Sequence, residues 1–333
     1  MKIACMTFPP DGMVYLCRGL KERGHEVRVF HTTPDMLKES TIVTPPGQWD
    51  GFDVCYTRWD YLELDSLYDF DPDVVVMWNG SAPWSKDSTE VIRSLFKTVH
   101  LEFGWIPQKD HYYIANDLAP HASFIMDVPE DYPINEAAIK ALRELYKPRY
   151  VDLSLPEKFI LFPAQLDSDS SILRSSPYYK SSEVFLNDLR EYVKNVPIVI
   201  KIHPFDRCRK WPEGTHLYDG VLSAMELVSQ ASVVIGINST VLAEALVHNK
   251  PVFSYGYNVA MRSHISGLSY SDKKEFFEYA EHVCLGGEYT PPHNPEQTLS
   301  WLLTKQWPYN APTDGVFEYV ESFNKNGGSN ANI

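Results

Sequence analysis

The sequence runs Ile198-Val199-Ile200-Lys201-Ile202-His203-Pro204, then through a helix-like stretch over residues 221–231, and then Val233-Val234-Ile235-Gly236-Ile237-Asn238-Ser239-Thr240. A second helix-like stretch follows over residues 241–246, and a third apolar run, Pro251-Val252-Phe253-Ser254, comes after it. Runs of β-branched residues separated by helical segments are typical of a parallel sheet that is buried on both faces. This part of the chain therefore predicts a βαβαβ unit.

Polar side chains follow the first two apolar runs at the point where each run ends. Lys201 and His203 come at the end of one run, and Asn238, Ser239 and Thr240 at the end of the next. Open parallel sheets bind ligands outside the carboxyl ends of their strands, so we expect these residues to meet at the ends of neighbouring strands. Lysine and histidine donate charge-assisted hydrogen bonds, and a helix that begins at Ser239 favours an anion. The pattern predicts a phosphate or diphosphate site, with a plain helix cap at Thr240 as the competing interpretation.

The composition is that of a globular protein of about two domains. The chain has 333 residues, of which 44% are hydrophobic and 22% charged, and these are ordinary proportions. The net charge of −14 disfavours a protein that coats nucleic acid with its whole surface, because such binding depends on Lys and Arg neutralising phosphates. Basic residues do gather around the proposed site, namely Arg174, Lys180, Lys201, His203, Arg207, Arg209 and Lys210.

The cysteines and the N-terminus indicate the compartment. The five cysteines are widely spaced and lack the paired spacing of a zinc site, so a reducing cytoplasm is the simplest location. The sequence contains neither a signal-peptide pattern nor an apolar run long enough to span a bilayer. We therefore expect a cytoplasmic protein whose membrane association, if it has any, is peripheral.

The first half of the chain opens like a Rossmann fold. A strand-like run over residues 2–8 leads through a glycine-containing loop to a helix-like run over 13–23 and a second strand-like run over 25–30. The dinucleotide fingerprint G-x-G-x-x-G is absent, which argues against an NAD enzyme. Further on, Glu102 ends a short strand-like run beside aromatic residues that suit a sugar face; a solvated loop carboxylate is the alternative interpretation.

Proline-rich sequence separates the two halves. Prolines flank one amphipathic stretch between residues 128 and 156, which is typical of a connection between domains. We expect a Rossmann-like N-terminal domain over 1–127, the connection over 128–156, a second Rossmann-like domain over 157–312, a C-terminal helix over 313–324 that packs back on the first domain, and a disordered tail over 325–333.

Three groups of residues resemble motifs of known sugar transferases. Lys201-Ile202-His203-Pro204, together with residues 238–246, is similar to the HP and Ser/Thr motifs of bacterial sialyltransferase-like and capsule polysaccharide transferases. Two other segments, Glu102 to Gln108 and Phe162 to Asp169, look like motifs of capsule-type β-Kdo transferases. The resemblance implies the GT-B architecture, an α/β fold with two Rossmann-like domains that face each other across a cleft. In that architecture the first domain binds the acceptor and the second binds a nucleotide-sugar donor.

The resemblance also implies the chemistry, a metal-independent glycosyl transfer with a CMP-Kdo-like or UDP-sugar donor as co-substrate and no other cofactor. Positive groups at the leaving phosphate stabilise the charge that grows as the glycosidic bond breaks. The implied phosphate and nucleotide contacts are Lys201, His203, Gln165, Arg174, Asn238, Ser239, Thr240 and Glu244. The implied catalytic residues are Asp167, Asp169, Glu102 and His203, with two carboxylates as base or nucleophile and as acid or orienting group. The implied acceptor contacts are Trp105, Gln108, Tyr112 and Tyr113.

Four alternatives stay open. The string Asp167-Ser168-Asp169 also fits a D-x-D metal motif, although such triplets are common in an acidic chain. A phage-type glycosyltransferase that acts on modified DNA bases shares the compact fold, and the acidic balance counts against a duplex acceptor without settling the matter. A non-hydrolysing sugar-nucleotide 2-epimerase shares the phosphate site, but residues 238–244 lack its paired glycines and second glutamate. The last is a non-catalytic sugar-nucleotide-binding subunit of a polysaccharide assembly.

The expected partners are accordingly a sugar nucleotide and a glycan or other acceptor, with a membrane surface, an assembly partner or DNA as further possibilities.

Overall fold

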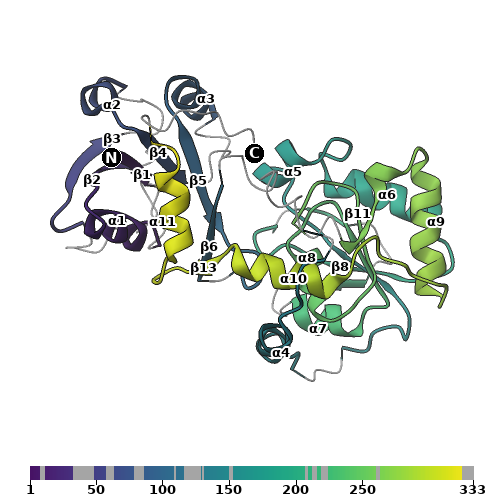
Figure 1. Cartoon of the computed structure of the whole chain (residues 1–333). Helices are drawn as coiled ribbons and strands as arrows, with labels where there is room; N and C mark the ends of the chain where they lie inside the picture. Colours follow the sequence, from purple (N-terminus) through teal and green to yellow (C-terminus); the bar gives the residue numbers. More distant parts are fainter. Residues whose placement is uncertain are drawn as a thin grey trace. The chain divides into compact units, whose positions relative to one another are not determined.

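The computed structural model describes residues 1–7, 12–32, 49–57, 64–78, 86–108, 110–115, 129, 131–149, 153–206, 209–211, 216–218, 224–259 and 263–324. The chain forms two compact α/β units (Figure 1). Unit 1 comprises Met1–Phe124 together with Lys305–Ile333, and unit 2 comprises Ile125–Thr304. Each unit is built on one sheet. The tail expected over residues 325–333 lies outside the described residues.

The sheet of unit 1 has the strand order β13-β6-β5-β4-β1-β2-β3. Its strands are β1 (Lys2–Thr7), β2 (Glu26–Thr32), β3 (Asp53–Thr57), β4 (Val74–Trp78), β5 (Thr98–Phe103), β6 (His111–Ala115) and β13 (Trp307–Pro308). β1 to β5 pair in parallel, with Ile3 opposite both Val27 and Val74, whereas β6 is antiparallel to β5 and to β13. The order runs outward from β1 in both directions, which is the Rossmann arrangement.

Helices from both ends of the chain cover this sheet. They are α1 (Gly12–Glu22), α2 (Leu64–Phe70), α3 (Lys86–Leu95) and α11 (Asp314–Glu321). Figure 1 shows α11, in yellow, beside α1, and Arg23 at the end of α1 pairs with Glu321 at 2.8 Å. A Cβ on Gly19 would lie 2.2 Å from the Phe317 ring, so the two helices pack this closely only with glycine there. The C-terminal segment, including residues 305–312, thus belongs to unit 1.

The sheet of unit 2 has the order β12-β11-β10-β7-β8-β9 and is parallel throughout. Its strands are β7 (Ile160–Pro163), β8 (Ile198–Lys201), β9 (His216–Tyr218), β10 (Val233–Gly236), β11 (Val252–Ser254) and β12 (Ile265–Ser266). The expectation that β8 and β10 are neighbours is corrected, because β7 lies between them. The first strand of a Rossmann sheet takes the central position, and the later strands are added on either side of it.

The helices of unit 2 cover both faces of its sheet. They are α4 (Glu136–Leu145), α5 (Ser170–Ser175), α6 (Ser182–Tyr192), α7 (Ala224–Gln230), α8 (Val241–Val247), the 3₁₀ turn η5 (Gly267–Ser269), α9 (Lys273–Cys284) and α10 (Pro295–Thr304). Phe185 of α6 and Phe277 of α9 meet at 5.4 Å between ring centroids in the core. Around α8 pack α4, α7 and α10, so α4, expected in the connection over 128–156, packs within unit 2.

The elements of unit 2 depart from the sequence expectations in two further places. The helix expected over 221–231 is described from Ala224 to Gln230, and β9 adds a strand before it that the apolar pattern did not predict. β9 is an edge strand of three residues with two exposed side chains, so it lacks the continuous apolar run of a central strand. Across the described residues, no helix combines the length and the apolar character needed to cross a membrane.

Candidate active site at the strand ends of unit 2

The predicted phosphate contacts lie at one edge of the unit 2 sheet. Pro163 of β7 is paired with Lys201 of β8, and a Cβ on Gly236 of β10 would lie 3.7 Å from the Pro163 ring. Neighbouring strands are about 4.8 Å apart, so the ends of β8 and β10 are separated by about 10 Å. A lysine side chain and a phosphate together span that distance. The junction of β7 and β10 is also where the strand order reverses, the place at which sheets of this kind bind ligands.

Lys201 and Glu244 interact electrostatically at this edge. Lys201 is 6% exposed, and its Nζ donates a hydrogen bond to the Ile202 carbonyl at 3.0 Å. Burial raises the pKa of the Glu244 carboxyl to about 7, and Lys201 acts in the opposite direction. A carboxyl whose pKa is strongly raised, beside a buried lysine, is a common property of functional sites.

Tyr146 joins this pair and was not found from the sequence. It is the C-cap of α4 and is 3% exposed, and its pKa is raised by burial and by the nearby Glu244 carboxylate. α4 packs against α8, which carries Glu244, so tertiary packing brings the two side chains together. The only sequence signal was an amphipathic stretch that we interpreted as a connection between domains.

His203 is held as a neutral hydrogen-bond donor. The backbone N–H of Phe205 donates to His203 Nδ1 at 3.2 Å, so Nδ1 is an acceptor and the neutral ring carries its proton on Nε2. Burial lowers the pKa of His203; of its charged neighbours, Asp169 and Asp206 raise it and Lys201 lowers it. Near pH 7 the imidazole therefore presents an Nε2–H group without needing a positive charge.

The hydroxyls after β10 are arranged differently from a plain helix cap. Thr240 is the N-cap of α8, but its side chain makes no capping hydrogen bond. The backbone N–H of Val241 instead donates to Ser239 Oγ at 3.3 Å. Thr240 already has helical backbone angles, φ −60° and ψ −23°, whereas a capping side chain requires an extended N-cap residue. The interpretation of Thr240 as a plain helix cap is therefore wrong, because its side chain does not cap α8.

Gln165 and Asn238 bind each other. Gln165 Nε2 donates to Asn238 Oδ1 at 3.0 Å, the Asn238 backbone N–H donates to Gln165 Oε1 at 3.2 Å, and Asn238 Nδ2 donates to the Ser171 carbonyl at 2.7 Å. The two side chains are 6% and 4% exposed. These hydrogen bonds link the ends of β7 and β10, and the contact of both amides with the donor stays a prediction. Arg174, expected beside them, is partly buried in the last turn of α5.

The two carboxylates of the D-x-D string belong to separate networks. Asp167 accepts hydrogen bonds from Ser181 Oγ at 2.8 Å and from the Ser182 N–H at 2.9 Å, and Arg209 Nη2 lies 2.9 Å from its Oδ1. Asp169 is the N-cap of α5 and accepts from the Ser171 N–H and hydroxyl, each at 2.8 Å. A carboxylate has about four acceptor positions, so Asp167, whose side chain is 41% exposed, keeps one of them accessible.

The residues expected to contact an acceptor lie in unit 1, and three of them are buried. Trp105, Tyr112 and Tyr113 are 3%, 5% and 1% exposed. Trp105 stacks on Tyr113 at 4.2 Å, and Tyr112 packs against Trp78 at 5.7 Å. These three side chains pack in the interior of unit 1, and their assignment as acceptor contacts stays a prediction.

Glu102 and Gln108 keep some solvent access. Glu102 is partly buried in β5, opposite Tyr113, and its Oε1 accepts a hydrogen bond from the Phe103 N–H at 2.8 Å. The Glu102 carboxylate is also one of the causes, after burial, of the raised pKa of Tyr113. Gln108 is exposed. The role of both residues in an acceptor site stays a prediction.

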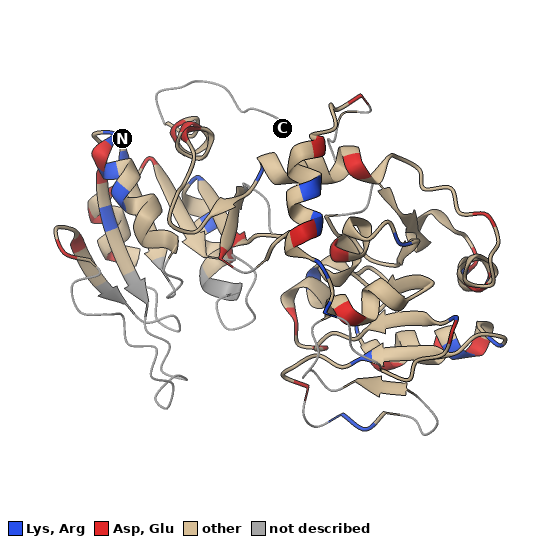
Figure 2. Cartoon of the chain, turned by 90° about the horizontal axis from the view of Figure 1, so that it is seen from below, with Lys and Arg blue, Asp and Glu red and all other residues tan. Residues whose placement is uncertain are grey.

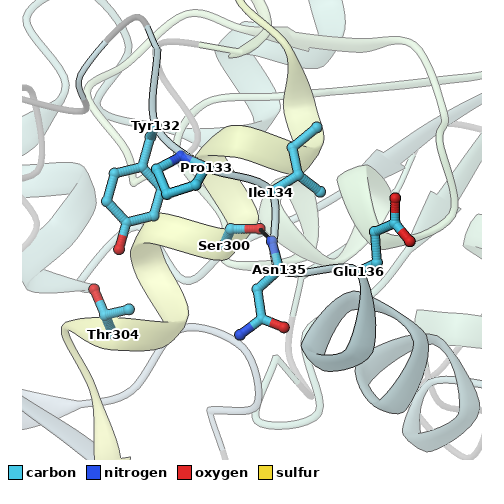
Figure 3. Close-up of a pocket in the computed structure, with 7 residues that line it drawn as sticks. All are labelled: Tyr132, Pro133, Ile134, Asn135, Glu136, Ser300 and Thr304. Atoms are coloured by element: carbon cyan, nitrogen blue, oxygen red, sulfur yellow. Dashed lines mark hydrogen bonds between the residues drawn. The ribbon is translucent and has the colours of Figure 1, made fainter.

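A pocket of about 530 Å³ lies elsewhere on unit 2 (Figure 3). Its lining residues are Tyr132, Pro133, Ile134, Asn135, Glu136, Ser300 and Thr304. It surrounds the start of α4, where the Asn135 N–H donates to Ser300 Oγ at 2.9 Å. Tyr146 is at the other end of α4, which has 10 residues and is therefore about 15 Å long. The pocket is thus separate from the strand-end site. Figure 2 shows basic and acidic positions distributed along the ribbons of both units.

Comparison with known proteins connects this site to a family. Residues 139–282 match the family described as capsule polysaccharide biosynthesis protein. This span contains Tyr146, Asp167, Lys201, His203 and Glu244. The chain resembles the capsule polysaccharide biosynthesis proteins. The resemblance inferred from the sequence motifs is confirmed.

Individual relatives agree with this resemblance. The protein FixF of Sinorhizobium fredii is 31% identical over 216 residues, which is 60% of this chain and 53% of FixF. The capsule polysaccharide export protein KpsS of Escherichia coli is 29% identical over 171 residues, 42% of this chain and 41% of KpsS. The chain spans about half the length of the curated relatives it matches.

A solved structure supports the fold. The β-Kdo 2,7 transferase KpsC of Thermosulfurimonas dismutans superposes with a TM-score of 0.55 over 97% of this chain and 98% of that chain, at 16% identity. The likeness covers both sheets. The predicted α/β fold of the GT-B class, with two Rossmann-like domains, is confirmed.

Proposed function

We propose that the chain is a glycosyltransferase that moves a sugar from a nucleotide-activated donor to a glycan acceptor, without a divalent metal. The proposal is supported by three residues that follow strands at one edge of the unit 2 sheet, within the region that matches the capsule family: a buried lysine, a neutral histidine and a threonine whose hydroxyl makes no capping hydrogen bond. KpsC, a protein of the same fold, is described as a β-Kdo 2,7 transferase, which agrees with the proposal.

Lys201, His203 and Thr240 hold the donor phosphate in this proposal. Lys201 Nζ supplies the positive charge, and His203 Nε2–H and the Thr240 hydroxyl supply directed hydrogen bonds. The burial of Lys201 strengthens its attraction for an anion, because few water molecules screen it. When the glycosidic bond breaks, the phosphate gains negative charge, and donors that are already in place stabilise that charge in the transition state.

Asp167 is the carboxylate that acts at the anomeric carbon. Its three hydrogen-bonding partners fix its orientation, and it still has an accessible acceptor position. Such a group serves as a base toward the acceptor hydroxyl or as a nucleophile toward the sugar. Asp169, whose charge raises the pKa of His203, is the competing candidate for this role. Glu102 of unit 1 is proposed as the second carboxylate.

Glu244 contacts the nucleotide ribose in this scheme, and Tyr146 lies near Glu244 as a buried neighbour. A carboxyl whose pKa is about 7 accepts hydrogen bonds when ionised and donates one when protonated, so it suits a diol in either state.

Turnover of sugar nucleotides tests the proposal. The purified chain is incubated with CMP-, UDP-, GDP- and dTDP-sugars and glycan acceptors in the presence of EDTA, and release of the nucleotide is measured. We expect one donor class to turn over, and Asp167→Asn to lose turnover while it still binds that donor. A new sugar nucleotide formed without acceptor would indicate an epimerase instead. Binding with no turnover by the wild-type protein on any donor and acceptor would indicate a non-catalytic subunit.

A further inference from the structure

Arg209 connects three segments at the strand edge of unit 2. Its Nη2 lies 2.9 Å from Asp167 Oδ1 and 3.4 Å from the Gln165 carbonyl oxygen, and its Nε lies 3.0 Å from Asp206 Oδ2. The guanidinium carbon is 5.1 Å from the centre of the Trp211 ring. The side chains of Arg209 and Asp206 are only 13% and 7% exposed.

The two carboxylates that Arg209 contacts come from neighbouring strand ends. Asp167 follows β7, and Asp206 lies in the turn after β8 that also carries His203. That turn is closed by a hydrogen bond from the Asp206 N–H to the His203 carbonyl at 2.9 Å. One guanidinium therefore ties the proposed catalytic carboxylate to the turn that holds the proposed phosphate-binding imidazole.

Stability alone does not account for this arrangement. Removing charges from water offsets most of the Coulomb energy of a buried ion pair, so such a pair is a weak source of net stability. Asp167 already accepts hydrogen bonds from Ser181 and Ser182 at the start of α6. The guanidinium adds a direction, because its planar group donates a hydrogen bond to Asp167 from one nitrogen while another nitrogen lies beside Asp206 as an ion pair. A lysine ammonium has no such fixed arrangement of donors.

We propose that Arg209 is a positioning residue of the transferase, which holds Asp167 at a fixed separation from the His203 turn during sugar transfer. The inference rests on the proposed function. Arg209 makes and breaks no bond in the reaction. It acts through Asp167 on one side and through Asp206 and the turn on the other.

The first test needs no substrate. The imidazole of His203 is followed by NMR as a function of pH in the wild-type chain, in Arg209→Gln and in Arg209→Lys. The charges that face this ring are Asp169, Lys201 and Asp206. Without its cationic partner, Asp206 acts more strongly on the ring, so the titration midpoint of His203 is expected to rise in Arg209→Gln and to stay nearer the wild-type value in Arg209→Lys.

Arg143 provides the matched control for this test. It is a partly buried arginine of the same unit, held by the Val247 carbonyl, Asn249 and Glu296. Arg143→Gln is expected to leave the His203 midpoint unchanged. An unchanged midpoint in folded Arg209→Gln, or an equal shift in Arg143→Gln, would overturn the inference.

The second test uses the donor identified by turnover. Displacement of a reacting group by about 1 Å can cost about 100-fold in rate. We therefore expect kcat to fall about 10- to 100-fold in Arg209→Gln and Arg209→Lys, while the KM for the donor changes little. Added guanidinium ion is expected to restore part of the rate of Arg209→Ala. Unchanged kcat in the Arg209 variants contradicts the positioning role. If the wild-type chain turns over no donor, the proposed function fails, and the NMR test still decides whether Arg209 controls the His203 turn.

Discussion

Units 1 and 2 share the order of their five central parallel strands but have different side chains around the strand ends. In unit 1 the last residues of β4 and β5, Trp78 and Phe103, pack their rings together at 4.7 Å. In unit 2 the corresponding edge has Lys201, a linked pair of amides and the partly buried Glu244. The fold thus determines where a ligand binds, and the side chains determine which ligand it is.

The difference also separates stability from function. The aromatic groups of unit 1 bury apolar surface and stabilise the sheet. Lys201 and Glu244 of unit 2 carry charges with little access to water, which costs folding free energy unless the charges are paired. We therefore expect changes in unit 1 to affect mainly stability and changes at the strand edge of unit 2 to affect mainly ligand binding.

The largest effect is expected from Trp78→Ala in unit 1. Trp78 is 8% exposed and contacts both Phe103 and Tyr112, so truncation should destabilise unit 1 by about 3–5 kcal/mol. Hydrogen exchange of the β4 and β5 amides measures this loss, with Trp78→Phe as the conservative control. Nucleotide affinity should be unchanged at temperatures where unit 1 stays folded. A loss of nucleotide affinity in folded Trp78→Ala would contradict the assignment of stability to unit 1 and of ligand binding to unit 2.

The next effect is expected from Lys201→Met in unit 2. Loss of a charge-assisted contact with a phosphate costs about 1.5–3 kcal/mol, so nucleotide affinity should fall by roughly 10- to 100-fold. Isothermal titration with the nucleotide of the active donor measures the change. Arg28→Met in β2 of unit 1, where Arg28 pairs with Asp53 at 2.6 Å, is the matched control and should bind normally. Equal affinity of Lys201→Met and the wild-type chain would place the phosphate elsewhere.

A smaller effect is expected from the pH dependence of Glu244. The pKa of about 7 in the folded chain lies above the ordinary value of 4.5, so the folded state keeps a proton that the unfolded state releases. This contribution to stability is fully present below pH 4.5 and is lost as pH rises through about 7. Glu244→Gln should remove most of that decline, as measured by urea denaturation from pH 4.5 to 8. Glu136→Gln, an exposed glutamate of α4, should not change it. If the stability of Glu244→Gln falls with pH as steeply as that of the wild-type chain, the Glu244 carboxyl does not have a raised pKa in the folded state.

The local parts of the site could be predicted from the sequence, and the long-range parts could not. The runs that become β8 and β10 are apolar and β-branched, and the polar residues directly after them are visible in the chain order. The position of β7 between them depends on pairing between distant segments, which periodicity does not encode. Tyr146 reaches Glu244 only because α4 packs on α8.

The acceptor contacts expected in unit 1 show the same limit. Tyr112 follows the alternation of a strand, and an exposed face was a reasonable expectation. The Tyr112 ring is buried against Trp78 and Phe103, and its backbone pairs with Trp307 of β13, which is far away in the sequence. The structural role of the Gln165 amide was hidden for the same reason, since its partner Asn238 is 73 residues away.

The most direct test of the account is hydrogen exchange of the whole chain with saturating CMP, UDP, GDP or dTDP. One nucleotide is expected to slow exchange in residues 198–206 and 236–247 of unit 2, and to leave β4, β5 and β6 of unit 1 unchanged. Slower exchange confined to unit 1, or no change with any of the four nucleotides, would contradict the assignment of the donor site to the strand ends of unit 2.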